Sequence, residues 1–496
     1  MRDIALNANT SISAEKEELR LQWSDILWPL MYMLSLVMIG LHFPLGYLGV
    51  LAILVNRYRQ DKYDFVIMFT LLIGGYNLLT QAELTSLLVH IVMLICIIGI
   101  CMLKKTPFSR KIVYGLLGYF LILLAFAFIS DESLWVQSIE MMNYLSIAYF
   151  IVPIMVFSGE EFDIKIFTRH LMVYALIFCT FYCIDTYIIN GFVLLPRDAS
   201  MLTYNMNSTF DDPFAFPFSM TFPRHWPMGL YILMACIFPI MHFYKLSRWH
   251  WLLIILAFVS SRTFSFTMGL IIAAIIYQNN SRRALWSLII GAVAITGLYF
   301  IDDALPKNYD VESGAQSTLR IQSSIQQFFD VTQATDDEDL AKFGTGRMAQ
   351  ALPKLEHLYS MGLEWTGFGF LSRANTKSQK YIIVNELYDN PEIEEEVATG
   401  VEIVPLQIFL TIGYLGLILH IAFFIYLCWC IRKLKYARYF YSILVAFAIA
   451  GFGGFSGWIR PNSLYLIAIV LSAVILAQKR ELGFSLPPLQ KKHSYD

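Results

Sequence analysis

Residues 256–273, LAFVSSRTFSFTMGLIIA, form an apolar run that holds one charged residue, Arg262. A charge at membrane depth costs roughly 3 to over 10 kcal/mol. An arginine is retained at such a place when it pairs with another group, reaches water or binds an anion. The stretch therefore predicts a membrane protein. In it, Arg262 either binds an anionic substrate or is a snorkelling or structurally paired side chain.

Composition supports this interpretation. The chain has 496 residues, of which 57% are hydrophobic and 15% charged, and its mean hydropathy is +0.57. Soluble domains carry about 25% charged residues. The apolar segments are too long and continuous for barrel strands, so we expect an all-α polytopic protein. Residues 1–25 are polar and lack an apolar signal core, so the first spanning helix is expected to direct insertion.

Hydropathy divides the chain into about fourteen transmembrane segments. They are about 26–41, 42–56, 64–80, 84–103, 112–130, 141–157, 166–189, 226–244, 249–261, 264–278, 284–301, 403–430, 439–457 and 461–477. Several are shorter than the roughly 20 residues that a perpendicular span needs. The stretches 26–56 and 249–278 each predict either two short helices or one long broken helix.

Loop charge gives the orientation. With fourteen crossings and a cytoplasmic N-terminus, the basic loops near residues 57–62, 104–111, 245–248, 282–283 and 432–438 all face the cytoplasm, as does the C-terminal tail. The opposite face receives residues 302–402, where seventeen Asp and Glu precede Glu402 against eight Lys and Arg. The predicted parts are a cytoplasmic segment 1–25, a bundle of about eleven helices 26–301, the outer loop 302–402, about three helices 403–477, and a cytoplasmic tail 478–496.

The outer loop is predicted to be structured. Apolar residues recur at helical spacing in 317–329 and 348–359, which predicts two amphipathic helices over the membrane face. Glycines then cluster at Gly362, Gly367 and Gly369. Acidic runs at 336–339 and 392–396 act as solvated spacers between these parts.

Candidate site residues lie on the predicted outer face. Guanidinium groups stay charged and bind phosphate oxygens in pairs. Five arginines are candidates for an anionic substrate: Arg224, Arg262, Arg320, Arg347 and Arg460. Each can alternatively be a solvated or paired charge with no role in substrate binding. This alternative is favoured for Arg224, Arg320 and Arg460. His225 is the histidine found beside other polar residues at an outer helix mouth, and it is a further candidate substrate contact.

Glu402 follows an acidic run and opens the apolar segment 403–430. A carboxylate there can orient or deprotonate an acceptor hydroxyl, or it can simply be an acid at a helix start. No histidine pair has zinc-site spacing, and the first outer loop, 42–44, has no carboxylate. Asp211-Asp212 and Asp302-Asp303 are explained by turns and caps. We therefore expect no metal, no cofactor and no use of ATP.

Four stretches resemble motifs of the O-antigen ligase/polymerase superfamily. Residues 258–270, FVSSRTFSFTMGL, look like its serine-arginine helix junction. Residues 346–370, GRMAQALPKLEHLYSMGLEWTGFGF, look like its arginine, amphipathic helix and Gly-x-Gly turn. Residues 404–417 and 221–239 resemble the helices that follow its two outer loops. The resemblance covers about residues 190–430, in the family's order.

The resemblance implies a glycosyltransferase of GT-C-like architecture in a bacterial inner membrane. The expected reaction is metal-independent, inverting glycan transfer from undecaprenyl diphosphate, with lipid-linked glycan as donor and acceptor. Arg347 and Arg262 match arginines that bind diphosphate in that family. Glu402 falls where its ligases usually carry histidine, which favours a repeat-unit polymerase. The resemblance also implies a chain-length regulator as a partner, and no nucleic acid is expected.

Other functions remain open at this point. A ligase that attaches O-antigen to another lipid, or a protein O-oligosaccharyltransferase, would use the same chemistry. A flippase or transporter for lipid-linked oligosaccharide would suit fourteen helices. However, transporters usually show two similar halves with short loops, and this chain has a single outer loop of about 100 residues late in the sequence. A purely structural membrane protein is the remaining alternative.

Overall fold

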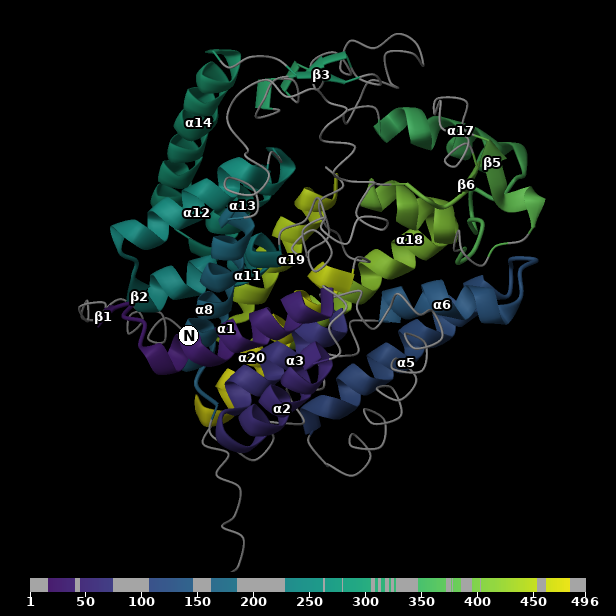
Figure 1. Ribbon diagram of the computed structural model, residues 1–496. Coiled ribbons are helices and arrows are strands. Elements are labelled where there is room, and N and C mark those ends of the chain that lie inside the picture. Colours follow the sequence, from purple (N-terminus) through teal and green to yellow (C-terminus); the bar gives the residue numbers. More distant parts are fainter. Residues whose placement is uncertain are drawn as a thin grey trace, which may run out of the picture.

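The computed structural model describes most of the helical segments. It covers residues 17–40, 45–74, 107–145, 162–184, 228–261, 264–278, 280–304, 308–310, 314–316, 321–322, 325–326, 347–371, 376, 378–384, 395–401, 403–452 and 461–481. Figure 1 shows a mostly helical molecule, as the sequence predicts. The count of about fourteen spans and the GT-C-like architecture stay predictions.

The described helices are α1 (Trp23–Gly40), α2 (Leu45–Gln60), α3 (Lys62–Gly74), α5 (Pro107–Ala127), α6 (Leu134–Leu145), α8 (Ile164–Cys183), α11 (Met228–Phe243), α12 (Arg248–Ser261), α13 (Phe264–Gln278), α14 (Ser281–Ala304), α17 (Arg347–Ser360), α18 (Val404–Ile431), α19 (Ala437–Phe452) and α20 (Pro461–Glu481). Most of them lie within a few residues of a hydropathy segment; the exceptions are α6, which begins seven residues before the segment predicted at 141–157, and α17, which belongs to the predicted outer loop. The stretch 26–56 falls on two helices, α1 and α2, and 249–278 falls on α12 and α13. The segment 84–103 lies outside the described residues.

Strands are short and pair in twos. Near the chain start, β1 (Glu17–Glu18) pairs in parallel with β2 (Tyr244–Lys245). In the predicted outer loop, β3 (Asn308–Asp310) pairs with β4 (Gly314–Gln316). Further along, β5 (Ile382–Val384) pairs antiparallel with β6 (Glu395–Val397). A 3₁₀ turn, η4 (Gln379–Tyr381), precedes β5.

Three of the described helices are long and apolar enough to cross a membrane, by length and composition: α8, α14 and α18. They differ in how much of their surface the protein covers. The most apolar window of α8 is 61% buried inside the protein, and that of α14 is 6% buried. Figure 1 places α14 at the edge of the bundle. A helix that is apolar all round and uncovered by protein is suited to contact with lipid.

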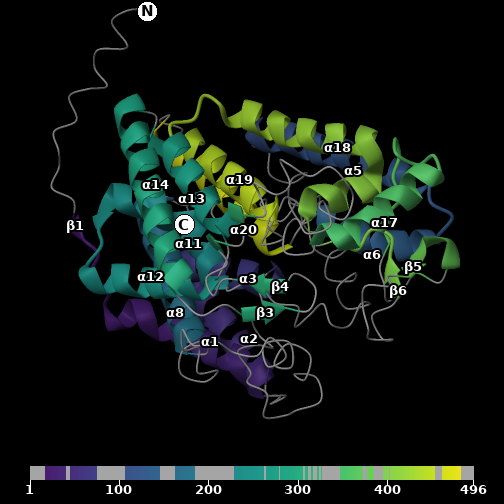
Figure 2. The same ribbon diagram turned by 90° about the horizontal axis from the view of Figure 1, so that it is seen from above.

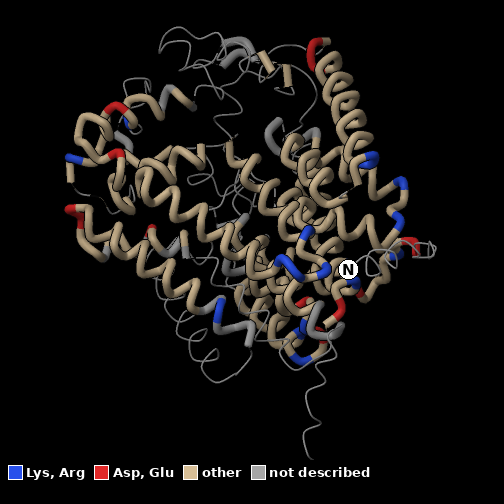
Figure 3. The backbone as a smooth tube through the Cα atoms, turned by 180° about the vertical axis from the view of Figure 1, so that it is seen from behind, with Lys and Arg blue, Asp and Glu red and all other residues tan. Residues whose placement is uncertain are grey.

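The main core lies where α8, α11, α19 and α20 meet. The residues of α20 from Leu464 to Ala477 are buried on every face, so this helix runs through the interior. Gly229 of α11 lies against the backbone of Cys179 in α8, so these two helices approach closely. Long stretches of helix carry no Lys, Arg, Asp or Glu (Figure 3), and α18 carries none over its 28 residues.

A second, smaller core forms over the start of α18. Ala351 and Leu358 of α17, Phe368, and Phe409 and Leu410 of α18 are buried together. In Figure 2, α17 and the β5–β6 pair lie beside the first half of α18, and α5 runs alongside α18. The amphipathic helix predicted at 348–359 is therefore confirmed as α17. Of the helix predicted at 317–329, the described residues 321–322 and 325–326 are helical.

Candidate functional site

The helix α17 begins at Arg347, the arginine that the sequence singled out. Its end is fixed by Gly362, whose φ of +65° suits glycine. The Leu363 N–H donates to the Leu358 carbonyl (3.1 Å) and the Gly362 N–H to the Tyr359 carbonyl (3.0 Å). This pair of bonds is the Schellman motif, which caps the last carbonyls of a helix. The chain then turns back over α18.

The turn that follows α17 packs into a break in α18. Gly413 has φ +61° and ψ −169°, which are not helical, so the ordinary i to i−4 bonds fail around it. Residues 364–369 fill the gap, and we call their contact with residues 410–415 the interlock. Its four hydrogen bonds join Phe368 N–H to the Leu410 carbonyl (2.8 Å), Gly369 N–H to Thr411 (2.9 Å), Tyr414 N–H to Glu364 (2.9 Å) and Leu415 N–H to Trp365 (3.2 Å).

Two glycines make the close approach possible. A Cβ on Gly367, whose φ is +76°, would overlap the backbone of Thr411 and Ile412. A Cβ on Gly413 would overlap the backbone of Trp365 and Thr366. Any larger residue at either position would therefore force the two segments apart. The interlock satisfies backbone groups that a broken helix would otherwise leave unpaired, which is how irregular backbone is tolerated in a membrane protein.

Residues 131–137, from the turn after α5 into α6, contact the chain that follows the interlock. Gln137 of α6 is fully buried, and its Oε1 accepts the Phe370 N–H (2.6 Å). The Tyr381 hydroxyl accepts the Asp131 N–H (3.1 Å). Asp131 also pairs with Lys380 (2.5 Å). The Lys380 ammonium lowers the pKa of the Asp131 carboxyl, and the same contact raises the pKa of Lys380.

Lys354 ties α17 to the residues before α18. This lysine is 1% exposed, and its ammonium donates to the Gly400 carbonyl. Val401 and Ile403, which flank Glu402, are each 3% exposed. A buried lysine with its charge at a backbone carbonyl is costly unless the surrounding structure fixes it. Lys354 therefore fixes the chain next to Glu402 relative to α17.

The structure describes one of the seven candidate residues. Arg347 is the first residue of α17, and its side chain lies outside the described side chains. The other six lie outside the described residues: Arg224, His225, Arg262, Arg320, Glu402 and Arg460. Whether they converge on Arg347 stays a prediction. What the structure adds is the scaffold that holds α17 against the broken helix.

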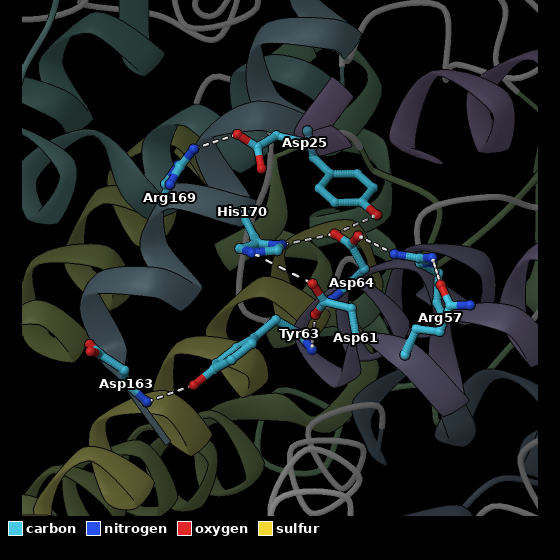
Figure 4. A network of polar contacts seen from close by, with 10 residues as sticks. Asp25, Arg57, Asp61, Tyr63, Asp64, Asp163, Arg169 and His170 are labelled. Atoms are coloured by element: carbon cyan, nitrogen blue, oxygen red, sulfur yellow. Dashed lines mark hydrogen bonds and ion pairs between the residues drawn. The ribbon is translucent and has the colours of Figure 1, made fainter. Parts of the chain in front are cut away.

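A second polar group lies among α1, α2, α3 and α8, and the sequence interpretation missed it. Asp61, Asp64 and His170 bring one ligand atom each within 4.8 Å of one another, so within the described ranges these three side chains can hold a metal. We call them, with Arg57 and Tyr174, the charged cluster (Figure 4). The spacing of Arg57, Asp61 and Asp64 along one helical hairpin was a signal, but His170 lies over 100 residues away.

Arg57 stabilises one side of this cluster. Its guanidinium lies over the ring of Trp28 (4.1 Å) and contacts Asn56 and Gln60. It also lies 3.8 Å from Asp64 Oδ2, and both side chains are nearly buried. The sequence predicts Arg57 in a basic loop, whereas it lies in the last turn of α2 and is 6% exposed. Its side of the membrane stays a prediction.

No protein-family model, no curated protein and no solved structure matches this chain. The superfamily resemblance of the motifs therefore stays a prediction.

Proposed function

We propose that this chain polymerises lipid-diphosphate-linked oligosaccharide repeat units at the outer face of a bacterial inner membrane. The observation that carries the proposal is the interlock, which holds a helix that begins with Arg347 against a broken apolar helix. The stretch 346–370, which resembles the superfamily's loop, is the stretch that folds as α17 and the glycine turn. The lipid that carries each repeat unit is undecaprenyl diphosphate.

The start of α17 suits a diphosphate. The first N–H groups of a helix have no partner within the helix, and they favour negative charge. Arg347 is the first residue of this helix. Guanidinium groups and helix N–H donors each bind phosphate oxygens, and both are assigned here to the diphosphate. Arg262 is the second arginine assigned to the diphosphate.

The reaction needs no metal in this proposal. A hydroxyl of one lipid-linked glycan attacks the anomeric carbon of the other, forming a C–O bond as the bond to the diphosphate oxygen breaks. The diphosphate leaves with the electron pair, and Arg347 and Arg262 stabilise its charge. Glu402 accepts the hydroxyl proton or orients the hydroxyl. Arg320, Arg224, His225 and Arg460 are assigned to the bound glycan and lipid head.

The test is a polymerisation assay with the purified chain and undecaprenyl-diphosphate repeat units in EDTA. We expect the wild type to form a ladder of products. Arg347→Ala should lower the rate about 10²- to 10³-fold, the usual loss on removing one such donor. Arg347→Lys should recover part of it, because lysine keeps the charge without the paired geometry.

Arg282→Ala is the matched control, because Arg282 is an exposed arginine in the first turn of another helix, α14. It should leave the ladder unchanged. A ladder that survives Arg347→Ala at full rate would remove Arg347 from the diphosphate site. No ladder from the wild type, with flipping of the same lipid in liposomes, would replace the polymerase with a transporter.

A further inference from the structure

Three exposed aromatic side chains meet where α17 ends and α18 breaks. Tyr359 is 50% exposed, Trp365 is 61% exposed and Tyr414 is 40% exposed. The Trp365 and Tyr414 rings meet edge to face with their centroids 5.6 Å apart, and the Tyr359 and Tyr414 hydroxyl oxygens are 2.8 Å apart. We call these three side chains the aromatic platform. Large rings that are exposed as a group, rather than singly, mark surfaces that bind a ligand, a partner or lipid.

The protein holds the platform in place. The Trp365 carbonyl accepts the Leu415 N–H (3.2 Å) in the interlock, so the backbone beside the platform is fixed. Phe409 is buried in the smaller core, and its ring centroid lies 4.6 Å from that of Tyr414 and 6.4 Å from that of Tyr359. Preformed aromatic surfaces bind ligands at a low cost in conformational entropy.

Polar groups lie beside these rings. One of the two tyrosine hydroxyls donates to the other, so the second keeps its own hydrogen for a ligand. Glu364, next to Trp365, has one carboxylate oxygen without a hydrogen bond in the described part of the chain. The hydrogen bond with Tyr414 raises the pKa of Tyr359, and the Glu364 carboxylate adds to that rise, which indicates negative charge near the hydroxyl pair.

A sugar ring matches this combination of groups. Its C–H bonds form an apolar face that stacks on an aromatic ring, and its hydroxyls both donate and accept hydrogen bonds. A carboxylate such as that of Glu364 accepts sugar hydroxyls but repels the phosphate of a lipid head group. Further along α18, the exposed side chains Leu415, Ile418 and Ile425 are aliphatic, as expected of a surface against lipid tails. The platform differs from that surface.

The position of the platform indicates which sugar it would contact. Tyr359 lies about 18 Å along α17 from Arg347, at the rise of an α-helix. With the diphosphate at Arg347, a sugar on the platform is several sugar units away from the reacting bond.

We propose that the aromatic platform binds a sugar ring of the lipid-linked glycan at a distance from the reacting bond, an inference that rests on the proposed polymerase function. Trp365 stacks on the ring, and the Tyr359 and Tyr414 hydroxyls bind its hydroxyl groups. Such a contact is made equally in the substrate complex and in the transition state. It therefore strengthens binding and leaves the chemical step unchanged.

The first experiment follows the fluorescence of Trp365 in the full chain, purified and placed in lipid nanodiscs. The chain has ten tryptophans, so the signal of Trp365 is taken as the difference between wild type and Trp365→Phe. The probes are the free oligosaccharide released from undecaprenyl-diphosphate repeat units, and phosphatidylcholine with brominated acyl chains. We expect the oligosaccharide to protect Trp365 from quenching by acrylamide, and the brominated lipid to quench it weakly.

Trp429 is the matched control, because it is an exposed tryptophan near the other end of the same helix. Its signal, taken from Trp429→Phe, should be quenched strongly by brominated lipid and unchanged by oligosaccharide. A Trp365 signal that behaves like that of Trp429 would overturn the proposal and make the platform an anchor in the lipid interface.

The second experiment measures kcat and KM for polymerisation. Trp365→Ala should raise KM about tenfold and leave kcat almost unchanged, because it removes binding that the substrate and the transition state share. Trp365→Tyr keeps an exposed ring, so it should restore most of the affinity, and it replaces Trp365→Ala if that variant does not fold. Arg347→Ala should instead lower kcat.

The two proposals fail in different ways. Absence of a ladder from the wild type would contradict the polymerase, and the fluorescence experiment would still test whether the platform binds glycan. A normal wild-type ladder together with an unchanged KM for Trp365→Ala would contradict the platform and leave the polymerase in place.

Discussion

The interlock and the charged cluster both join segments that are far apart in the sequence, but they do so with different parts of the chain. The interlock uses backbone N–H and carbonyl groups, brought together because glycine leaves room at Gly367 and Gly413. The charged cluster uses side chains, held by ion pairs around Asp64. The stability of the interlock should therefore depend on side-chain volume and hardly on pH. The stability of the charged cluster should depend on charge.

The strongest test of this comparison is to add side-chain volume inside the interlock. Gly413→Val should destabilise the fold by about 4 kcal/mol, because it combines an unfavourable positive φ with overlap against the backbone of residues 365–366. Thermal unfolding in detergent measures it. The matched control is Gly362→Ala, which has a φ of +65° but open space around its Cβ, and should cost about 1 kcal/mol. Equal losses would mean that the close approach does not matter.

The next largest effect should come from removing charge in the cluster. Asp64→Asn leaves Arg57 without its nearby carboxylate, and breaking a buried pair in this way costs about 3 kcal/mol. The double variant Asp64→Asn, Arg57→Met should lose less than the single variant, because no unpaired charge stays buried. Chemical denaturation of both variants compares them. A double variant that is less stable than Asp64→Asn would show that Arg57 contributes mainly through Trp28.

A smaller effect tests how the interlock is supported. Gln137→Leu removes the acceptor of the buried Phe370 N–H, which should cost about 1–3 kcal/mol. Ser360→Ala is the control, since the Ser360 hydroxyl donates to the His357 carbonyl at an exposed position. We expect that variant to unfold within about 0.5 kcal/mol of wild type. Indistinguishable variants would remove Gln137 from the support of the glycine turn.

The smallest effect should come from the exposed ion pair of Asp131 and Lys380. The pKa of the folded Asp131 is lowered, so the stability that the pair contributes is present above about pH 4 and lost as the pH falls through the folded pKa. Lys380→Gln should therefore lower the unfolding midpoint slightly at pH 7, and the difference should shrink as the pH falls below about 4. High salt should reduce the difference. A difference that does not shrink at acidic pH would show that Lys380 acts through packing on Tyr381.

The spacing of apolar residues and the positions of glycines account for most of the fold that could be predicted from the sequence. The apolar segments are helical wherever the structure describes them. The spacing of Met348, Leu352 and Leu355 predicted α17, because burial follows a period that is visible in the chain. The glycines at 362, 367 and 369 stand out in the sequence, but their partner in α18 does not, because a hydrogen bond between backbone groups leaves no mark on residue identity. His170 carries no signal in the sequence for a related reason: its two aspartates are brought to it by packing, which a single sequence does not display.

The break in α18 also has a consequence for biogenesis. In a straight helix, the Tyr414 and Leu415 N–H groups would donate to the carbonyls of Leu410 and Thr411, which are four residues earlier. These are the same four groups that residues 364–369 bind in the interlock. The helix can therefore enter the bilayer unbroken, with its backbone satisfied, and exchange two internal bonds for four external ones when the turn docks. Bending of this helix and docking of residues 364–369, which are synthesised first, then become a single event.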